Sequence, residues 1–404
     1  MAGKFVVVGL IVGSTFGGIA GHAAEISAIS AVCESFLQNK NIEAANQACG
    51  EAVSKGKQSP QATPQLMARA HDNFGQVLQA QGKLKDAEAS FRQGFSLRQK
   101  IFGRDHPEVA ISLDLIAGVL TQQDRYADAE PIFARALALR EKVFGPHSGE
   151  TADSLHIFGV SAIAAGKPVA AENLFRRALD IRTARLGPSD PLVGRTLSNL
   201  AVATQATKGP LIAEPLFRQA LLVQEAALGA DDLSLLDTTE SLARVLGLNG
   251  KQAEAEPLWR RVLRNRERQF GMDDASLAVP LNELGELYLY ANLRENAEAM
   301  FRRALALREK AFGSNDQLVA DSASGLGRLF YAQGQFANAL PLLQHAAAIA
   351  HVASGPGNAI TLRRWDDVQR CIVALATLQP GAADNASAAT SMPNIIPSPN
   401  PNGF

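Results

Sequence analysis

The chain has 404 residues, with 39 lysines and arginines, 40 aspartates and glutamates, and a net charge of −1. This balance argues against a nucleic-acid partner, because such binding needs a basic surface that displaces the counterions of the phosphates. It argues equally against an anionic membrane surface. Aromatic residues make up only 6% of the chain, while alanine and leucine are abundant, which suits helices that pack closely through small residues.

The first 23 residues are typical of a secretory signal peptide. Lys4 precedes an apolar run over residues 5–19, and Gly21-His22-Ala23 places small residues where a signal peptidase cleaves. The apolar run is shorter than the roughly 20 residues that span a membrane. We therefore expect cleavage after Ala23, a mature chain in the periplasm or outside the cell, and no membrane insertion of that chain.

A nine-residue pattern then recurs at a fixed spacing of 42 residues, with no insertion between copies. A constant period of this size predicts stacked helical repeats rather than a closed globule. The copies are AEASFRQGF from Ala87, AEPIFARAL from Ala129, AENLFRRAL from Ala171, AEPLFRQAL from Ala213, AEPLWRRVL from Ala255 and AEAMFRRAL from Ala297.

Each period predicts two amphipathic helices, which we call the first and the second helix of a repeat. In the repeat over residues 106–145, apolar residues follow helical spacing in both halves, so each half has one apolar stripe and the two helices pack as a hairpin. Pro131, Pro215 and Pro257 are expected in the first turn of the second helix, where a missing N–H costs little. The stripes are Leu113, Ile116, Ala117 and Leu120 in the first helix, and Ala129, Phe133, Ala136 and Leu137 in the second.

This pattern resembles the tetratricopeptide repeat. The order Ala129, Phe133, Ala136, Leu137 and the glycine of QGKL at Gly82 match its motif. The usual period is 34 residues, and the 42-residue variety is similar to the repeats of kinesin light chains. The resemblance implies an all-α, right-handed α-solenoid that binds a protein or peptide partner.

Extending the period in both directions gives the expected domain organisation. The tetratricopeptide repeat solenoid covers residues 24–379, with about eight helical hairpins and a C-terminal capping helix over residues 358–379. The segment over residues 380–404 is rich in proline, asparagine and serine, which predicts a disordered tail. The repeats are expected near residues 26–63, 64–105, 106–147, 148–189, 190–231, 232–273, 274–315 and 316–357.

Two of the three cysteines are placed for a disulfide. Cys33 is the first-helix equivalent of Ala117, and Cys49 is the second-helix equivalent of Phe133, so the two lie on facing sides of one hairpin. Export favours oxidation, and we expect a bond between them. The alternative is a pair of buried thiols that behave as small hydrophobic residues. Cys371 has no partner left.

No catalytic or metal-binding motif stands out in the sequence. The seven histidines are scattered, and none belongs to an HExxH motif or a CxxC pairing. We therefore expect a chain that is not an enzyme and that holds no metal and no cofactor. Adjacent charges such as Arg140 with Glu141 and Arg308 with Glu309 predict a solvated outer face.

The first helices of such repeats line a concave groove. Relative to Leu113 and its equivalents, the residues two before, one after, two after and five after point into the groove in the family. In this chain the set is polar and mixed in charge. We expect the partner to contact Arg69, Asp72, Asn73, Gln76, Arg195, Asn199, Glu240, Arg244, Asn282, Glu283, Glu286 and Arg328.

Two functions are consistent with the sequence. The first is an exported interaction scaffold that holds an extended peptide or a helix of a protein partner in its groove. The second is a non-catalytic subunit or chaperone-like module of an envelope enzyme or secretion complex that uses its convex face. That face would carry the arginines of the second helices, namely Arg176, Arg177, Arg260, Arg261, Arg302 and Arg303.

Overall fold

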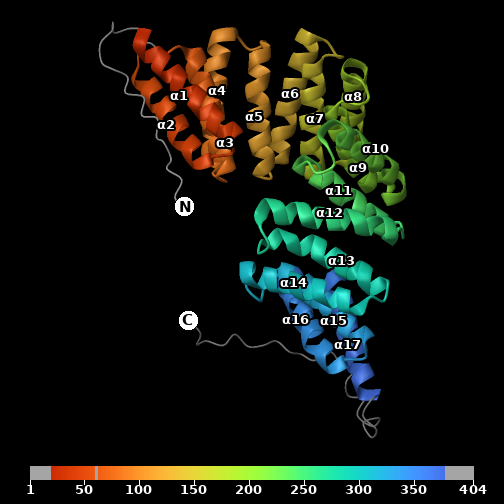
Figure 1. The fold of residues 1–404 in the computed structure, drawn as a ribbon. Coiled ribbons are helices and arrows are strands. Elements are labelled where there is room, and N and C mark those ends of the chain that lie inside the picture. Colours follow the sequence, from red (N-terminus) through yellow and green to blue (C-terminus); the bar gives the residue numbers. More distant parts are fainter. Residues whose placement is uncertain (1–19, 60–61, 378–404) are drawn as a thin grey trace. The chain divides into compact units, whose positions relative to one another are not determined.

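The computed structural model describes residues 20–59 and 62–377, and Figure 1 shows these residues as successive pairs of helices. Within them every regular element is a helix, which confirms the predicted all-α solenoid. The chain divides into two compact units, residues 1–229 and residues 230–404, and each is described by itself. The predicted signal peptide lies outside the described residues over 1–19, and the predicted tail lies outside them altogether.

Unit 1 consists of five helical hairpins. In each hairpin the first helix packs against the second, and each second helix contacts the first helix of the next hairpin. The pairs are α1 (Ala20–Gln38) with α2 (Ile42–Gln58), α3 (Pro64–Ala80) with α4 (Leu84–Phe102), α5 (Pro107–Gln122) with α6 (Tyr126–Phe144), α7 (Gly149–Ala164) with α8 (Pro168–Leu186), and α9 (Pro191–Lys208) with α10 (Pro210–Leu228).

Unit 2 consists of three hairpins and a last single helix. Its first two hairpins begin with a short 3₁₀ helix, η1 (Leu233–Leu235) or η2 (Ala275–Leu277), that leads into the first helix. The last helix, α17 (Ala359–Thr377), packs against α16. The pairs are α11 (Leu236–Leu248) with α12 (Gln252–Phe270), α13 (Ala278–Tyr290) with α14 (Arg294–Phe312), and α15 (Gln317–Ala332) with α16 (Phe336–Ser354).

The helix ends repeat as regularly as the cores. The second helices from α4 onward end at glycines spaced by 42 residues, whose φ angles lie between 80° and 89°. Only glycine adopts such angles without a steric cost. Three residues further on, a polar side chain caps the next helix, as when Asp190 accepts a hydrogen bond from the backbone N–H of Leu192 at 2.8 Å.

The prolines of the second helices lie deeper than the sequence analysis expected. Because α6 begins at Tyr126, α10 at Pro210 and α12 at Gln252, each of Pro131, Pro215 and Pro257 is the sixth residue of its helix, in the second turn. The expectation of a first-turn position was therefore wrong. The physical reason is the tight turn between the two helices, in which the N–H of Arg125 already bonds to the carbonyl of Leu120.

A large aromatic residue from each of the second helices α4, α6, α8, α10, α12 and α14 fills the core of its hairpin. Phe175 is fully buried, and a methyl group at Gly159 of the first helix would lie 2.6 Å from Cε1 of its ring. Gly75 faces Phe91 in the same way, at 2.4 Å. A small residue on the first helix thus lets the aromatic ring reach the helix backbone, and this close approach fixes how the two helices pack.

Candidate functional site

The predicted partner-binding residues lie on the first helices of both units. Unit 1 carries Arg69, Asp72, Asn73 and Gln76 on α3 and Arg195 and Asn199 on α9, while unit 2 carries Glu240 and Arg244 on α11, Asn282, Glu283 and Glu286 on α13, and Arg328 on α15.

Equivalent positions of neighbouring first helices form a common surface, which we call the first-helix face of unit 1. Helix α5 contacts both α3 and α7, and α7 contacts α9. On each helix three residues at spacing i, i+4 and i+7 share one side. They are Arg69, Asn73 and Gln76 on α3, Ile111, Leu115 and Gly118 on α5, Asp153, Ile157 and Val160 on α7, and Arg195, Asn199 and Val202 on α9.

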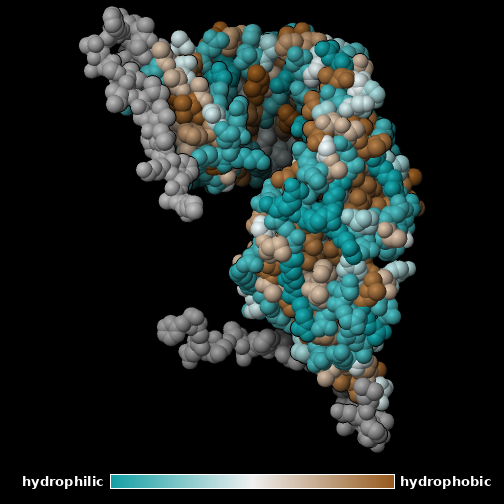
Figure 2. Space-filling view, viewed as in Figure 1, coloured by the Kyte–Doolittle hydropathy of each residue, from teal (hydrophilic) through white to brown (hydrophobic). Residues whose placement is uncertain are grey.

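The centre of this face is apolar, in contrast to the polar surface that the sequence analysis predicted. The side chains of Ile111, Ile157 and Val160 are 41%, 40% and 47% exposed. Figure 2 shows hydrophobic residues exposed over α5. The predicted polar residues occupy the two ends, on α3 and α9, and none of the predicted partner-binding residues lies on α5 or α7.

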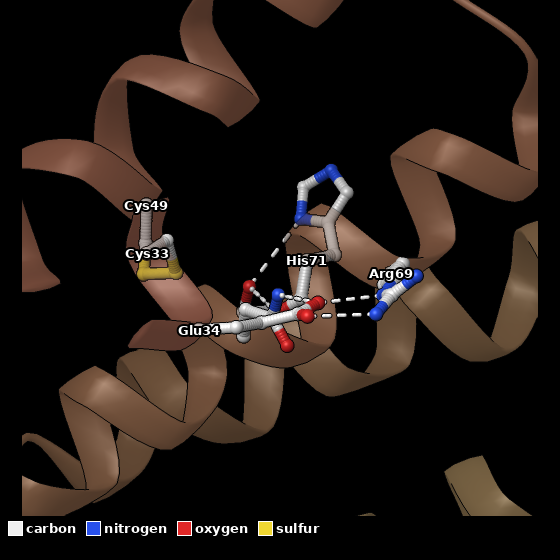
Figure 3. The surroundings of a disulfide bond; sticks show 7 residues. Cys33, Glu34, Cys49, Arg69 and His71 are labelled. Carbon is white, nitrogen blue, oxygen red and sulfur yellow. Dashed lines mark hydrogen bonds and ion pairs between the residues drawn. A yellow bond between two sulfur atoms is a disulfide. The ribbon is translucent and has the colours of Figure 1, made fainter. Parts of the chain in front are cut away.

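At the α3 end the polar residues are already engaged within the chain. Arg69 donates two hydrogen bonds to the Glu34 carboxylate, at 2.6 and 2.7 Å, and Asn73 donates a third at 2.9 Å. Figure 3 shows Glu34 and Arg69 facing each other beside the disulfide. Asp72 and Asn73 are buried, so the expectation that both are open to a partner was wrong; Gln76 is exposed.

Cys33 of α1 and Cys49 of α2 form a disulfide in the structure, with 5.1 Å between their Cα atoms (Figure 3). The bond holds the first hairpin together at the place where later repeats have a buried phenylalanine. Around it lie Ala45, Ala48 and Val77, together with partly buried residues of α1. Cys371 is a buried free thiol.

Removing this disulfide is expected to destabilise the first hairpin by about 3 kcal/mol, because the bond closes a loop of about 16 residues in the unfolded chain. Amide hydrogen exchange of the Cys33→Ser/Cys49→Ser variant would show the loss as faster exchange in α1 and α2. Mass spectrometry of the non-reduced, alkylated wild-type chain should find only Cys371 labelled, and labelling of all three thiols would contradict the bond.

At the α9 end of the face, a buried histidine connects the polar residues. The guanidinium of Arg182 lies 3.2 Å from Nδ1 of His156, and the amide nitrogen of Asn199 lies 3.1 Å from its Nε2. Since a guanidinium only donates, Nδ1 of His156 accepts, so the ring is neutral and carries its proton on Nε2, which the side-chain oxygen of Asn199 accepts once the amide is turned. Burial is the main cause that lowers the pKa of His156 to about 3, and Arg182 and Arg195 lower it further.

Acidification is therefore expected to destabilise the folded chain through His156. An unfolded histidine titrates near pH 6.5, so below that value the unfolded chain binds a proton that the folded chain binds only near pH 3. The stabilisation is present above pH 6.5 and is lost as the pH falls, by about 3 kcal/mol at pH 4. Urea unfolding at pH 7 and pH 4 measures this loss.

The His156→Asn variant isolates the contribution of this group. Burial also lowers the pKa of His71, to about 4, which acts in the same direction, and it raises the pKa of Asp72 to about 6, which acts in the opposite direction. Both groups remain in the variant, so only the difference in pH dependence between the two proteins reports on His156. Equal pH dependence in both would contradict the neutral buried ring.

A row of buried and half-buried arginines, which the sequence analysis did not identify, packs against the first helices. Each belongs to a second helix, and Arg98, Arg140 and Arg182 each join the first helix of their own hairpin to that of the next one. Arg98 forms an ion pair with Asp72 at 2.6 Å and donates to the Ser112 hydroxyl at 2.7 Å. The arginines are Arg98, Arg140 and Arg182 in unit 1 and Arg266 and Arg308 in unit 2.

This row corrects the expectation that Arg140 and Arg308 lie on a solvated outer face. The side chain of Arg308 is 5% exposed and donates to the Ser322 hydroxyl, and Arg140 bonds to Asp114 and Ser154. Their glutamate neighbours suggested a surface position, whereas the actual partners come from other helices. The 42-residue spacing of the arginines was the signal that could have revealed them.

In the last hairpin, a buried arginine from the following helix takes the place of the second-helix arginine. Ala350 stands where the arginine is expected, and Arg364 of α17 is buried there instead. Its guanidinium donates to the carbonyl of Ala346 and to the carboxylate of Asp321. Helix α17 therefore packs against the end of unit 2 through the polar contacts of Arg364 as well as through its apolar side.

The first helices of unit 2 line a groove of about 780 Å³ between α13, α15 and α17. It brings together five of the predicted residues, whereas Glu240 lies outside its lining and bonds to Arg244 and Arg266. Six arginines and four carboxylates line the groove, so its formal net charge is +2. The charged lining residues are Arg244, Arg308, Arg328, Arg363, Arg364, Arg370, Glu283, Glu286, Asp321 and Asp367.

Most of these charges are paired within the unit. Arg328 donates to Glu286, Arg370 pairs with Asp366 and Asp367, and Arg364 pairs with Asp321. Burial raises the pKa of Glu283. Among the residues that the structure describes, Arg363 has no ion-pair partner. The groove is therefore mostly self-neutralised, with one arginine available to an anionic group.

Most of the second-helix arginines form ion pairs, either with a neighbouring second helix or within their own helix. Arg177 pairs with Glu141 at 2.6 Å, and Arg303 pairs with Glu267 at 2.7 Å, each one repeat back along the chain. Arg302 pairs with Glu298 of its own helix at 2.8 Å. These exposed pairs contribute little stability each, but they leave the second-helix surface largely neutral.

Within residues 20–59 and 62–377, no group of three or more histidine, cysteine, aspartate or glutamate side chains could hold a metal ion. None of the helices described is long and apolar enough to cross a membrane.

The hairpins and their exposed first-helix faces define a helical-repeat scaffold. The family model of the tetratricopeptide repeat matches residues 66–130, 113–184, 192–268 and 275–350. These segments cover more than half of the chain, so the chain belongs to the tetratricopeptide repeat family, as its motif predicted. It is an interaction scaffold of that family, whose members bind protein or peptide partners. No curated protein sequence matches the chain.

Solved structures with the same fold share little sequence identity with this chain. The apo quorum sensor NprR from B. thuringiensis matches with a TM-score of 0.60 and 15% identity, over 80% of this chain and 87% of that chain. Aspartyl phosphate phosphatase F from Bacillus subtilis gives 0.51 and 14%, over 85% and 98%. Repeats of a putative kinesin light chain from Podosopora anserina give 0.44 and 21%, over 51% and 98%. At these identities the likeness shows the fold alone.

Proposed function

We propose that the chain is an exported, non-catalytic scaffold that holds a peptide segment of a protein partner on its first-helix faces, namely the first-helix face of unit 1 and the groove that the first helices of unit 2 line. The observation that carries this proposal is the groove of about 780 Å³ in unit 2, which three consecutive first helices line. A concave surface with apolar walls and a few convergent polar groups is the usual form of a binding site. Val279, Leu318 and Ile360 supply apolar walls beside the arginines.

Removing two arginines of this groove is expected to weaken partner binding at least tenfold. Arg244 and Arg363 both line the groove and are exposed, so Arg244→Ala/Arg363→Ala removes two donors without opening the core. Quantitative capture of the partner from an envelope extract measures the loss. The melting temperature should stay within a few degrees of that of the wild type.

The matched control is Arg302→Ala together with Arg177→Ala, which removes two arginines from second helices. This variant should capture the partner as well as the wild type does. If it loses the partner while the groove variant keeps it, binding takes place on the second-helix surface, as in the alternative role of a subunit or chaperone-like module. We favour the first-helix faces because Arg177, Arg302 and Arg303 are engaged in ion pairs within the chain.

Export is part of the proposal and rests on the sequence of residues 1–23. The mature chain should begin at Ala24 and be recovered from the periplasm or the medium. N-terminal sequencing of the exported protein tests this directly, because a chain that still begins at Met1 would show that the segment is not cleaved.

A further inference from the structure

The apolar centre of the first-helix face of unit 1 has no covering element among the residues that the structure describes. Ile111, Ile157 and Val160 are exposed there. Leu115, the α5 equivalent of Ile157, is half-buried. The positions span two helix turns, about 10 Å along the helix axis. Neighbouring helix axes lie about 8–10 Å apart, so α5, α7 and α9 together offer a surface about 20 Å wide.

Gly118 makes the same face unusual. It lies in the interior of α5, where glycine is less favourable than alanine. Gly75 and Gly159 are required because aromatic rings pack against them, whereas a methyl group at Gly118 would meet no atom within 4 Å. The packing of unit 1 therefore gives no reason for this glycine. A glycine at a helix surface does allow a second backbone to approach closely.

The hydrogen-bonding groups of the face distinguish between two kinds of ligand. An extended peptide would need partners for its backbone N–H and C=O groups, and burying them unpaired is costly. The apolar centre offers none, while Asn73 is bound to Glu34 and Asn199 faces His156. An α-helix satisfies its own backbone, so it can lie against Ile111 and Ile157 without such partners.

The charges at the α9 end indicate which polar group the ligand carries. Among the described residues, Arg195 has no hydrogen-bond or ion-pair partner, because its neighbour Asp153 pairs with Arg182 at 2.6 Å. Arg69, at the opposite end, is neutralised by Glu34. The face thus presents one unpaired cation beside an apolar strip.

We propose that the first-helix face of unit 1 binds an amphipathic α-helix of a partner protein, whose apolar stripe covers Ile111, Ile157 and Val160. The helix approaches α5 most closely at Gly118, and an acidic side chain next to its stripe pairs with Arg195. This inference rests on the proposed function, since it names the kind of segment that one of the two first-helix faces holds.

Selection from a random 16-residue peptide library on the full chain tests the proposal. The selected peptides should share apolar residues at spacing i, i+3 or i+4, and i+7, with an acidic residue beside them, and they should become helical on binding. Ile157→Glu and Gly118→Leu should each weaken their binding at least tenfold. Arg195→Ala should reduce at least fivefold the preference for a peptide with the acid over its glutamine counterpart.

The matched control is Val169→Asp, which places a charge at an exposed apolar residue on the second helix of the hairpin that contains Ile157. This change should leave peptide binding unaltered. Gly118→Leu should not lower the melting temperature, because its side chain enters open space. Equal loss of binding in Val169→Asp, or full binding in Ile157→Glu, would overturn the site.

The outcomes separate this inference from the proposed function. Selected peptides with alternating apolar residues and no helicity, sensitive to Ile157→Glu, would overturn the helical ligand but support peptide binding by the face. Peptides sensitive only to Arg244→Ala/Arg363→Ala would place binding in unit 2 and overturn the site in unit 1. A library that yields no peptide sensitive to either set would contradict both proposals.

Discussion

Replacing Arg182 by alanine is expected to destabilise unit 1 by about 3–5 kcal/mol, the usual cost of removing one partner of a buried charged network. The side chain of Arg182 is 3% exposed, and it bonds to Thr196 at 2.6 Å, to Asp153 at 2.6 Å and to His156. The substitution removes one of the polar connections between α7 and α9 and leaves the Thr196 hydroxyl and the histidine without the guanidinium that donates to them. Amide hydrogen exchange of α7, α8 and α9 in the full chain measures this loss.

A matched control lies on the same helix. Arg185 is exposed in the last turn of α8, so Arg185→Ala should change stability by no more than about 0.5 kcal/mol. If Arg182→Ala had as small an effect as Arg185→Ala, the arginine row would not be a structural connection between hairpins.

Replacing Phe301 by alanine is expected to destabilise unit 2 by about 3–5 kcal/mol, as for other large-to-small changes in a packed core. Phe301 is fully buried between two glycines of different first helices. Methyl groups at Gly285 of α13 and Gly325 of α15 would lie 2.7 and 2.5 Å from Cε1 of its ring. Its loss leaves a cavity that the rigid helix backbones cannot fill. Urea unfolding, followed in unit 2 by hydrogen exchange, gives the magnitude.

The fit between Phe301 and Gly325 can be tested from both sides. Gly325→Ala should itself destabilise unit 2, because its methyl group meets the ring. Combining it with Phe301→Leu should cost less than the sum of the two single changes, because the smaller side chain makes room for the methyl group. Strict additivity would show that the ring does not pack against this glycine.

The 42-residue period allowed the fold to be predicted almost completely. Glycines, caps and apolar stripes recur at the same spacing, so each repeat supports the interpretation of the others. The deeper position of Pro131 was missed because the length of the turn before α6 depends on local hydrogen bonds at Asp124 and Arg125. Element ends are in general less certain than element type.

The candidate site was harder to predict than the fold. Asp72 was expected to face a partner, yet it is buried and forms an ion pair with Arg98, which lies near the C-terminal end of the second helix α4. Residue type alone does not reveal such a contact, because it depends on which side chain a neighbouring helix brings near. The apolar centre at Ile111 and Ile157 was missed for a related reason, since only exposure separates a surface isoleucine from one in the core.

The measurement that tests the central claim most directly is photo-crosslinking of the full chain to its partner from four exposed positions. Gln76 lies on the first-helix face of unit 1 and Arg363 of α17 lines the groove of unit 2, whereas Val169 and Val352 lie on second helices, one in each unit. A photo-reactive residue at Gln76 or Arg363 is predicted to yield a covalent adduct with the partner, with none from Val169 or Val352. Adducts from the second-helix positions alone would contradict partner binding by the first-helix faces.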